Sequence, residues 1–318
     1  MKTIRQLKGP AFVLTLLTCL WVLVIVMLAI LRPSIFGPST VTTILQFSTI
    51  LALVSLGQAI VILAGGAGID LSVGGNVSLS AVAGMLALKA GLPAPFLPIS
   101  CIAFGTLLGA VNGLLVTRLA ILPLIATLGT LFIYSGLALA ITGGAAQSGV
   151  PAWLLVWGRG VVATIPVPFL TLAIPAFIAM GAVMLWTSWG RWILATGFNE
   201  RSARLVGIPV DRVRLLLYAI SGALAGAAGL ISLAWLGSAR PNIGQDLELE
   251  SLTAAMLGGI AITGGFGGVG GVLAAVVLLV TLKTGLLQLN VNTVWQVGIV
   301  GALLIFVLLA ERLSQRWR

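Results

Sequence analysis

The chain has 318 residues, of which 59% are hydrophobic and only 8% are charged. A soluble domain carries about a quarter charged residues, so this composition excludes a soluble globular protein and indicates a membrane protein. The formal net charge is +10 and histidine is absent, which disfavours an enzyme or a proton pump because both commonly rely on histidine.

Apolar runs long enough to cross a bilayer recur along the whole chain. About 20 helical residues span a hydrocarbon core of about 30 Å. We therefore expect one all-α domain over residues 1–318, a polytopic transmembrane helical bundle of about ten spans. The expected spans are 12–31, 44–64, 73–91, 95–116, 121–142, 167–188, 213–236, 248–264, 269–287 and 291–310.

The N-terminal segment resembles a signal peptide because Lys2, Arg5 and Lys8 precede an apolar run. The run over 12–31 is long enough to span, and no small-residue cleavage site ends it, so we expect a retained first span. If the N-terminus is cytoplasmic, most basic residues fall on that side, as the positive-inside rule requires. We therefore expect a multi-pass protein of the cell inner membrane with both termini cytoplasmic. Scattered basic residues indicate membrane lipid as a partner and no nucleic acid.

A glycine-rich pattern occurs twice, near the start and near the end of the chain. Gly65-Gly66, Ile69 and Gly74-Gly75 are matched at identical spacing by Gly258-Gly259, Ile262 and Gly267-Gly268. Apolar segments interrupted by glycine in corresponding halves are typical of broken helices that line a transport path. Because glycine is abundant, with 40 residues in the chain, coincidence is the alternative.

Asp70 is the one acidic residue of the first half and lies within the first glycine-rich segment. Its carboxylate is expected either to cap a helix that begins near Ser72 or to take part directly in solute passage. Neutral polar residues in the spans are candidates for lining the same path, with interhelical hydrogen bonding as the alternative for each. The translocation-path candidates are Asp70, Asn76, Gln58 and Asn112, and further polar residues of the spans are Gln46, Lys283, Gln288 and Gln296.

Residues 190–214 form the only charged stretch of any length in the middle of the chain. Asn199 can cap a short helix with Glu200 in its first turn, and Gly207 and Pro209 can end it. We expect a soluble protein to dock here; a basic loop that only fixes orientation is the alternative. The chain has no phosphate-binding G-x-x-x-x-G-K-[ST] motif, so ATP would be hydrolysed by a partner.

Cys19 and Cys101 lie in apolar runs and suggest packing residues, with no cofactor and no metal site.

Four segments in order resemble the ribose-type permeases of ATP-binding-cassette importers, the superfamily that includes branched-chain amino-acid permeases. They are LAGGAGIDLSVGGNVSLSAVAGM (63–85), LPLIATLGTLFIYSGLALAITGG (122–144), GRWILATGFNERSARLVGIPVDRVRLLLYAISGALAGAAGLI (190–231) and RPNIGQDLELESLTAAMLGGIAITGGFGGVGG (240–271). The resemblance covers nearly the whole chain.

The resemblance implies a permease that pairs with a second permease, identical or related. A pair of cytoplasmic ATPases would dock beneath, and an extracytoplasmic solute-binding protein would deliver the solute. Residues 200–207 resemble the family's coupling segment E-A-A-x-x-x-x-G, although Arg201 and Ser202 replace the two alanines. The resemblance implies no catalytic residue, and the implied ATPase-coupling residues are Glu200, Arg201, Ala203, Arg204 and Gly207.

The solute implied by the resemblance is a neutral monosaccharide or a sugar-like molecule such as ribose, rhamnose or autoinducer-2. The stretch GSARPNIG (237–244) resembles the autoinducer permeases. A facilitative channel for a small neutral solute, a branched-chain amino-acid permease and a membrane-embedded enzyme are the alternatives. The channel hypothesis offers no reason for the charged 190–214 loop, and the enzyme hypothesis needs a catalytic cluster that the sequence lacks.

Overall fold

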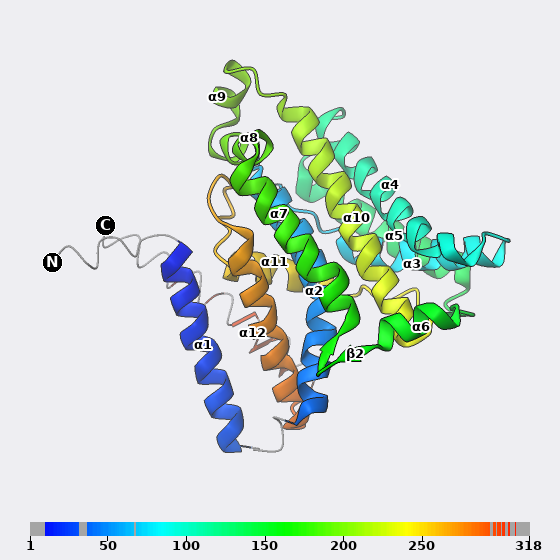
Figure 1. Ribbon diagram of the computed structural model, residues 1–318. Coiled ribbons are helices and arrows are strands. Elements are labelled where there is room, and N and C mark those ends of the chain that lie inside the picture. Colours follow the sequence, from blue (N-terminus) through cyan, green and yellow to red (C-terminus); the bar gives the residue numbers. More distant parts are fainter. Residues whose placement is uncertain are drawn as a thin grey trace.

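The computed structural model describes residues 10–31, 37–66 and 68–292, with isolated positions between 295 and 309. This part of the chain is mostly helical (Figure 1). The helices are α1 (Pro10–Leu31), α2 (Pro38–Leu63), α3 (Val73–Lys89), α4 (Leu97–Thr117), α5 (Pro123–Thr142), α6 (Ala152–Arg159), α7 (Ile174–Trp186), α8 (Ser188–Phe198), α9 (Glu200–Leu205), α10 (Val210–Leu236), α11 (Leu247–Leu257) and α12 (Val269–Gln288), with a 3₁₀ turn η2 (Ala94–Phe96) before α4 and a π-helical turn η3 (Phe169–Ala173) before α7. The short strands β1 (Gln147–Ser148) and β4 (Ser238–Ala239) pair antiparallel, as do β2 (Val161–Val162) and β3 (Ile165–Pro166).

Within the described residues, six helices are long and apolar enough to cross a membrane. They are Pro38–Leu63, Ala94–Thr117, Pro123–Thr142, Phe169–Trp186, Val210–Leu236 and Val269–Gln288. Shorter apolar helices are found at Leu17–Ile30 and Val73–Lys89. The all-α polytopic architecture is therefore confirmed, whereas the count of about ten spans stays a prediction.

The expected span 248–264 differs from the structure. Helix α11 ends at Leu257, and the following glycines leave the helix because Gly259, Gly264 and Gly267 have positive φ angles. Glycine adopts this backbone region without steric cost, so a continuous apolar stretch here does not give a continuous helix. The expected span 291–310 lies mostly outside the described residues.

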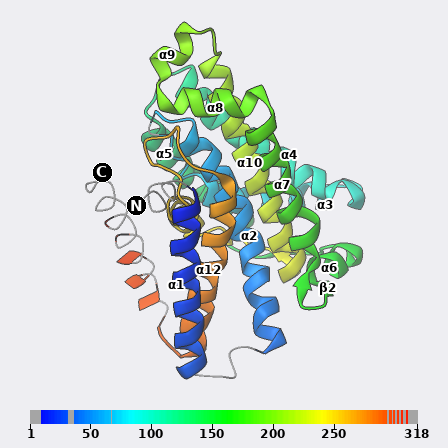
Figure 2. The same cartoon turned by 60° about the vertical axis from the view of Figure 1, so that its left-hand side comes forward.

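The helices differ greatly in burial. In α2, 83% of the most apolar window is buried, against 28% in α5. Side chains of α2, α10, α11 and α12 form the largest core cluster, and α2 and α12 lie side by side in both views (Figures 1 and 2). The exposed apolar faces of α4, α5 and α7 fit contact with lipid or with another membrane protein.

Helices α4 and α10 pack through glycine. Gly105, Gly109 and Gly113 recur every four residues on α4, and Gly222 and Gly226 do the same on α10. A Cβ added at Gly105 would lie 2.7 Å from the Cα of Gly226. The absence of side chains therefore permits the close backbone approach that small residues provide between membrane helices.

The two longest connections lie at opposite ends of the bundle. Helices α8 and α9, from the charged segment, stand at the top of Figure 1, whereas α6 and β2, from residues 143–166, lie at the lower right, near the other end of α10. Figure 2 shows the same separation from another side. This arrangement fits the expectation that the two connections face opposite sides of a membrane.

Candidate functional site

Helix α9 has the local structure that the sequence predicts. The side chain of Asn199 caps it by accepting a hydrogen bond from the backbone N–H of Ser202 at 2.9 Å. The chain leaves the helix at Gly207, whose φ of +84° is the left-handed conformation that glycine favours after a helix. The α9–α10 corner (residues 199–214) is thus a short capped helix followed by a turn into α10.

Ion pairs hold α9 against the first turns of α10. Glu200 pairs with Arg204 at 2.9 Å and with Arg214 at 2.7 Å, and Arg204 also pairs with Asp211 at 2.5 Å. Desolvation alone would raise the pKa of Glu200, but hydrogen bonds from Arg204 and Arg214 and the charges of these arginines lower it below its ordinary value. Glu200 is therefore a carboxylate at neutral pH that ties α9 to α10.

The residues that α9 presents outward are not all those expected from the sequence. Ala203 is only 2% exposed, whereas Leu205 and Val206 are 82% and 76% exposed. Arg201 is also exposed, and no ion pair to it is found in the described part of the chain. Sequence reasoning missed Leu205 and Val206; the available signal was a pair of apolar residues directly before the helix-ending Gly207.

Arg214 links the corner to the connection between α2 and α3. Its side chain is 15% exposed and ion-paired with Glu200. The same guanidinium lies so close to Gly66 that a Cβ there would overlap it, and Gly66 has a φ of +66°. Glu200 and Arg214 therefore form a continuous series of contacts from α9 to the backbone of the α2–α3 connection.

A second link joins three backbone segments through what we call the glycine junction: Gly65, Gly197, Gly264 and Gly265. A Cβ at Gly65 would lie 2.7 Å from the Cα of Gly197 in α8, and one at Gly264 would lie 2.5 Å from the Cα of Gly65. The N–H of Gly265 donates to the carbonyl of Leu63 at 2.9 Å. The α2–α3 connection, the end of α8 and the α11–α12 connection therefore touch without intervening side chains.

An aromatic contact lies beside the glycine junction. The rings of Phe198, at the end of α8, and Phe266, in the α11–α12 connection, meet edge to face with centroids 5.5 Å apart. Such pairs stabilise by about 0.5–1.5 kcal/mol beyond their buried area. Together with the junction, this pair is a second contact between the end of α8 and the α11–α12 connection.

The two glycine-rich segments occupy similar places between helices. The first pair of each segment follows a helix, at Gly65 after α2 and at Gly258 after α11. The second pair stands where the next helix begins, with Gly74 in the first turn of α3 and Gly268 directly before α12. Both segments therefore connect two successive helices, while a functional repeat and the duplication of two halves stay predictions.

Asp70 lies in a buried acid cluster, which we define as Asp70, Ser72, Asn112, Thr130 and Ser221. One carboxylate oxygen of Asp70 accepts hydrogen bonds from the N–H of Ser72 at 3.1 Å and from its hydroxyl at 2.6 Å. The other accepts from the hydroxyl of Ser221 at 3.1 Å. Asp70 is 1% exposed. Asp70 lies three residues before α3 and bonds to Ser72, the N-cap residue of this helix, whose own side chain forms no cap. The capping role of Asp70 stays a prediction.

Asn112 extends the buried acid cluster. Its amide nitrogen donates to the hydroxyl of Ser72 at 2.6 Å, and its oxygen accepts from the hydroxyl of Thr130 at 2.7 Å. Asn76 donates separately to the carbonyl of Gly105 at 3.0 Å. The structure thus brings Asp70 and Asn112 together, and the alternative of interhelical hydrogen bonding describes the contacts seen. A role of these residues in solute passage stays a prediction.

Gln58 stands apart from this cluster. It lies on α2 with no exposed surface, and neither its amide nitrogen nor its amide oxygen has a hydrogen-bond partner among the described residues. A buried amide without partners is costly, by about 1–3 kcal/mol for each group. Gln58 is therefore the translocation-path candidate whose hydrogen-bonding capacity is not used within the described structure.

Three of the four remaining polar residues of the spans have hydrogen-bond or ion-pair partners. Lys283 on α12 pairs with Glu250 on α11, which explains how an ammonium group is accommodated there. Gln288 donates to the hydroxyl of Thr40 at 3.0 Å, and Gln296 donates to the carbonyl of Val291 at 2.9 Å. The amide nitrogen of Gln46 is buried without a partner among the described residues.

Comparison with known proteins places this architecture in a family. Residues 40–308 match the family model for the permease component of branched-chain amino acid transport systems. The chain is 37% identical over 301 residues to the ribose import permease protein RbsC of Bacillus subtilis, with 92% of this chain and 90% of the relative covered. It is 35% identical to the autoinducer 2 import system permease protein LsrC of an Enterobacter species, with 99% of this chain and 90% of the relative covered. The LsrC protein of Klebsiella pneumoniae is 36% identical, with 91% and 84% covered. No solved structure matches the chain significantly.

Proposed function

Because the chain belongs to the family of permease components of branched-chain amino acid transport systems, we propose that it is the multi-pass membrane subunit through which an ATP-driven importer moves a sugar-like solute. Curated relatives that cover most of the chain are named as ribose and autoinducer 2 permeases. The substrate class is therefore a neutral monosaccharide or a sugar-like molecule such as ribose, rhamnose or autoinducer-2. These relatives favour it over branched-chain amino acids.

The observation that carries the proposal is the mechanical connection from α9 to both interrupted helices. Arg214 reaches from Glu200 to Gly66, and the end of α8 touches the α2–α3 and α11–α12 connections at the glycine junction. In this proposal a force on α9 reaches the α2–α3 connection through the ion-paired side chains of Glu200 and Arg214, and a force on α8 reaches both connections through the direct backbone contacts of the glycine junction. Rocking of the interrupted helices would then alternate access to the solute path.

The proposed partners follow from this arrangement. A cytoplasmic ATP-binding-cassette ATPase pair binds the outward side of α9, where Leu205, Val206 and Arg201 are exposed, and this ATPase hydrolyses the ATP. A second permease covers part of the apolar surface of the exposed helices. An extracytoplasmic solute-binding protein delivers the solute at the opposite end of the bundle, where α6 and β2 lie (Figure 1). The end of the bundle that carries α9 faces the cytoplasm. Both termini are also cytoplasmic in this proposal, and the membrane is the cell inner membrane.

Within the membrane, Gln58 is the proposed residue for hydrogen bonding to the solute during passage. A primary amide donates and accepts, which suits hydroxyl groups of a sugar without adding charge. Asp70 and Asn112 act by holding the connections that border the path, because their polar atoms already bond within the protein. Asn76 is tied to the carbonyl of Gly105 through its amide nitrogen, while its amide oxygen has no partner among the described residues. The permease performs no covalent step.

Coupling between the ATPase and transport is tested with variants of the corner. The assay uses vesicles that contain the complete transporter. Glu200→Arg reverses the charge that faces Arg204 and Arg214. Gly207→Trp places a bulky side chain at a backbone φ of +84°, a conformation that residues other than glycine rarely adopt. Both variants should hydrolyse ATP without moving solute, while membrane insertion stays normal. Arg191→Gln, an exposed arginine of α8 outside the ion-pair network, is the matched control. Normal transport by both variants would remove the coupling assignment.

Copurification distinguishes the importer from a facilitative channel. The tagged chain, extracted gently from its membrane, should carry a nucleotide-binding ATPase in roughly equal copies with total permease. A second permease in the same complex would show whether the pair is identical or related. If the chain purifies alone and passes sugar into liposomes without ATP, the channel hypothesis replaces the importer.

A further inference from the structure

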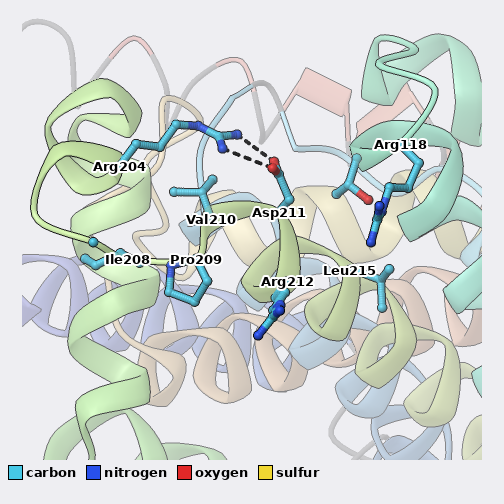
Figure 3. A pocket seen from close by; sticks show the side chains of 10 residues that line it. Arg118, Arg204, Ile208, Pro209, Val210, Asp211, Arg212 and Leu215 are labelled. Atoms are coloured by element: carbon cyan, nitrogen blue, oxygen red, sulfur yellow. Dashed lines mark hydrogen bonds and ion pairs between the residues drawn. The ribbon is translucent and has the colours of Figure 1, made fainter.

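A groove of about 630 Å³ lies beside the α9–α10 corner, and we call it the arginine groove. Its lining residues are Thr117, Arg118, Arg204, Gly207, Ile208, Pro209, Val210, Asp211, Arg212 and Leu215. Figure 3 shows Arg118 and Arg204 on opposite sides of Asp211. The volume is within the range of about 300–1,000 Å³ that is common for small-molecule sites. The exposed residues proposed above to face the ATPase, Leu205, Val206 and Arg201, are not part of this lining, whereas the coupling residues Arg204 and Gly207 are.

The charge of the arginine groove favours an anion. Three arginines and one carboxylate line the groove, and Asp211 is already paired with Arg204 at 2.5 Å. Arg118 and Arg212 have no ion pair within the described residues. Two guanidinium groups are thus available, and their fork of N–H donors matches the oxygens of a phosphate.

The backbone around the groove adds to this preference. The N-terminus of α10, a helix of 27 residues, borders the groove, and its N-cap Pro209 offers no side-chain cap. The positive end of a helix dipole attracts negative charge. The arginines and the N-terminus of α10 therefore both favour the binding of an anion in the groove.

The surroundings of the groove indicate where such an anion comes from. The groove lies where α4 ends and α10 begins, and both helices are membrane-span candidates. Leu119 and Leu122 nearby in the chain are each 65% exposed, and Leu216 on α10 is 43% exposed. Exposed apolar residues adjacent in the chain to a basic pocket suit a lipid whose acyl chains contact them while its phosphate headgroup enters the pocket. The lining contains no aromatic side chain that could stack on a nucleotide base.

From these observations we propose that the arginine groove binds the phosphate headgroup of an anionic phospholipid, with Arg118 and Arg212 as the direct phosphate ligands. The bound lipid connects the end of α4 to the start of α10, next to the turn at Gly207. This proposal depends on the membrane location of the chain and not on its coupling to an ATPase.

The test measures lipid retention by the full-length chain without any partner. Native mass spectrometry compares dioctanoyl phosphatidylglycerol with dioctanoyl phosphatidylcholine, which has equal acyl chains but no net charge. We expect the unmodified chain to retain the anionic lipid about tenfold more strongly, because the choline cation of phosphatidylcholine offsets the charge of its phosphate and is repelled by the arginines. The preference should fall as salt rises.

Variants assign the preference to the groove. Arg118→Gln with Arg212→Gln should abolish it, whereas Arg118→Lys with Arg212→Lys should keep part of it and also controls for folding. Arg191→Gln removes an arginine outside the groove and should keep it fully. An unchanged preference in the glutamine double variant would overturn the proposal.

Two further outcomes would replace the lipid with another occupant. Displacement of phosphatidylglycerol by millimolar inorganic phosphate, with equal effect on all headgroups, would assign the site to free phosphate. Crosslinks from positions 118 and 212 to the copurified ATPase, with no lipid retained in that complex, would make the groove a protein-docking surface. Neither result would alter the coupling test, because that test rests on transport and ATP hydrolysis.

Discussion

Glu200 and Asp70 are two carboxylates placed in opposite kinds of environment. The side chain of Glu200 is 38% exposed and is bound by two arginines. Asp70 is 1% exposed, and its described partners are a backbone N–H and two hydroxyls. Exposed ion pairs are weak and adjustable, whereas buried hydrogen bonds are directional and costly to leave unmade. The α9–α10 corner is therefore suited to shift, and the buried acid cluster to hold its shape.

The largest effect is expected from removing the buried carboxylate. Asp70→Leu leaves the N–H of Ser72 and the hydroxyl of Ser221 without their acceptor, at about 1–3 kcal/mol for each stranded group. Thermal unfolding of the full chain in detergent should show a clearly lowered midpoint. Asp70→Asn, which keeps an acceptor oxygen of similar shape, should lower it less. A leucine variant as stable as the unmodified chain would contradict a structural role for the cluster.

A large effect on transport is expected at the glycine junction, which lies between the two regions. Gly265→Val places a β-branched residue at a φ of +78°, with its Cβ 2.6 Å from the backbone nitrogen of Phe198. The left-handed backbone alone costs roughly 1–2 kcal/mol, and the overlap adds to this. Solute uptake should be lost while the protein still inserts. Gly270→Val is the control because a Cβ there meets nothing within 4 Å. An equal loss of solute uptake in both variants would show that the contacts of the glycine junction are not what transport requires.

A moderate effect is expected for the link between Glu200 and Arg214. A double-mutant cycle with Glu200→Gln and Arg214→Gln should give an interaction free energy of about 1 kcal/mol, above many surface pairs because Arg214 is only 15% exposed. Unfolding midpoints of the single and double variants measure this energy. Arg191→Gln combined with Glu200→Gln should be additive. Additivity of the first pair as well would show that the link carries no energy.

The smallest effect concerns pH. The pKa of Glu200 lies below its ordinary value of 4.5, so its folded-state ionisation stabilises the protein above that value. The stabilisation is lost as pH falls below 4.5 and through the lowered pKa. The difference in unfolding midpoint between the unmodified chain and Glu200→Gln should therefore be present at about pH 7 and shrink toward about pH 3. A difference that grows on acidification would contradict the ion pairs.

Several expectations from the sequence agree closely with the structure because they depend on local chemistry. The cap at Asn199 and the helix end at Gly207 follow from side-chain and backbone preferences of single residues. The expected span 213–236 became α10 over Val210–Leu236. The charged Glu200 was expected on α9, but its three-way arrangement with Arg204 and Arg214 was not.

Other features of the structure could not be predicted from the local chemistry of the sequence. Apolar length over 248–264 suggested a span, yet α11 ends at Leu257 because the following glycines turn the chain. Ala203 was expected among the coupling residues, and the structure buries it while exposing Leu205 and Val206. Which face of a six-residue helix is covered depends on what packs against it, and the sequence of that helix contains no such information.

The amino-acid sequence by itself determined that the protein is a bundle of apolar membrane helices with a charged segment in its middle and interruptions at glycine. These properties follow from composition, from apolar length and from the conformational freedom of glycine, and each is local in the chain. Only the tertiary structure decided that Gly65, Gly197 and Gly265 meet, that Asp70 bonds to Ser221, and that Arg118 and Arg212 line one groove. These contacts join residues far apart in the chain, so they arise from the packing of helices and cannot be deduced from any one segment.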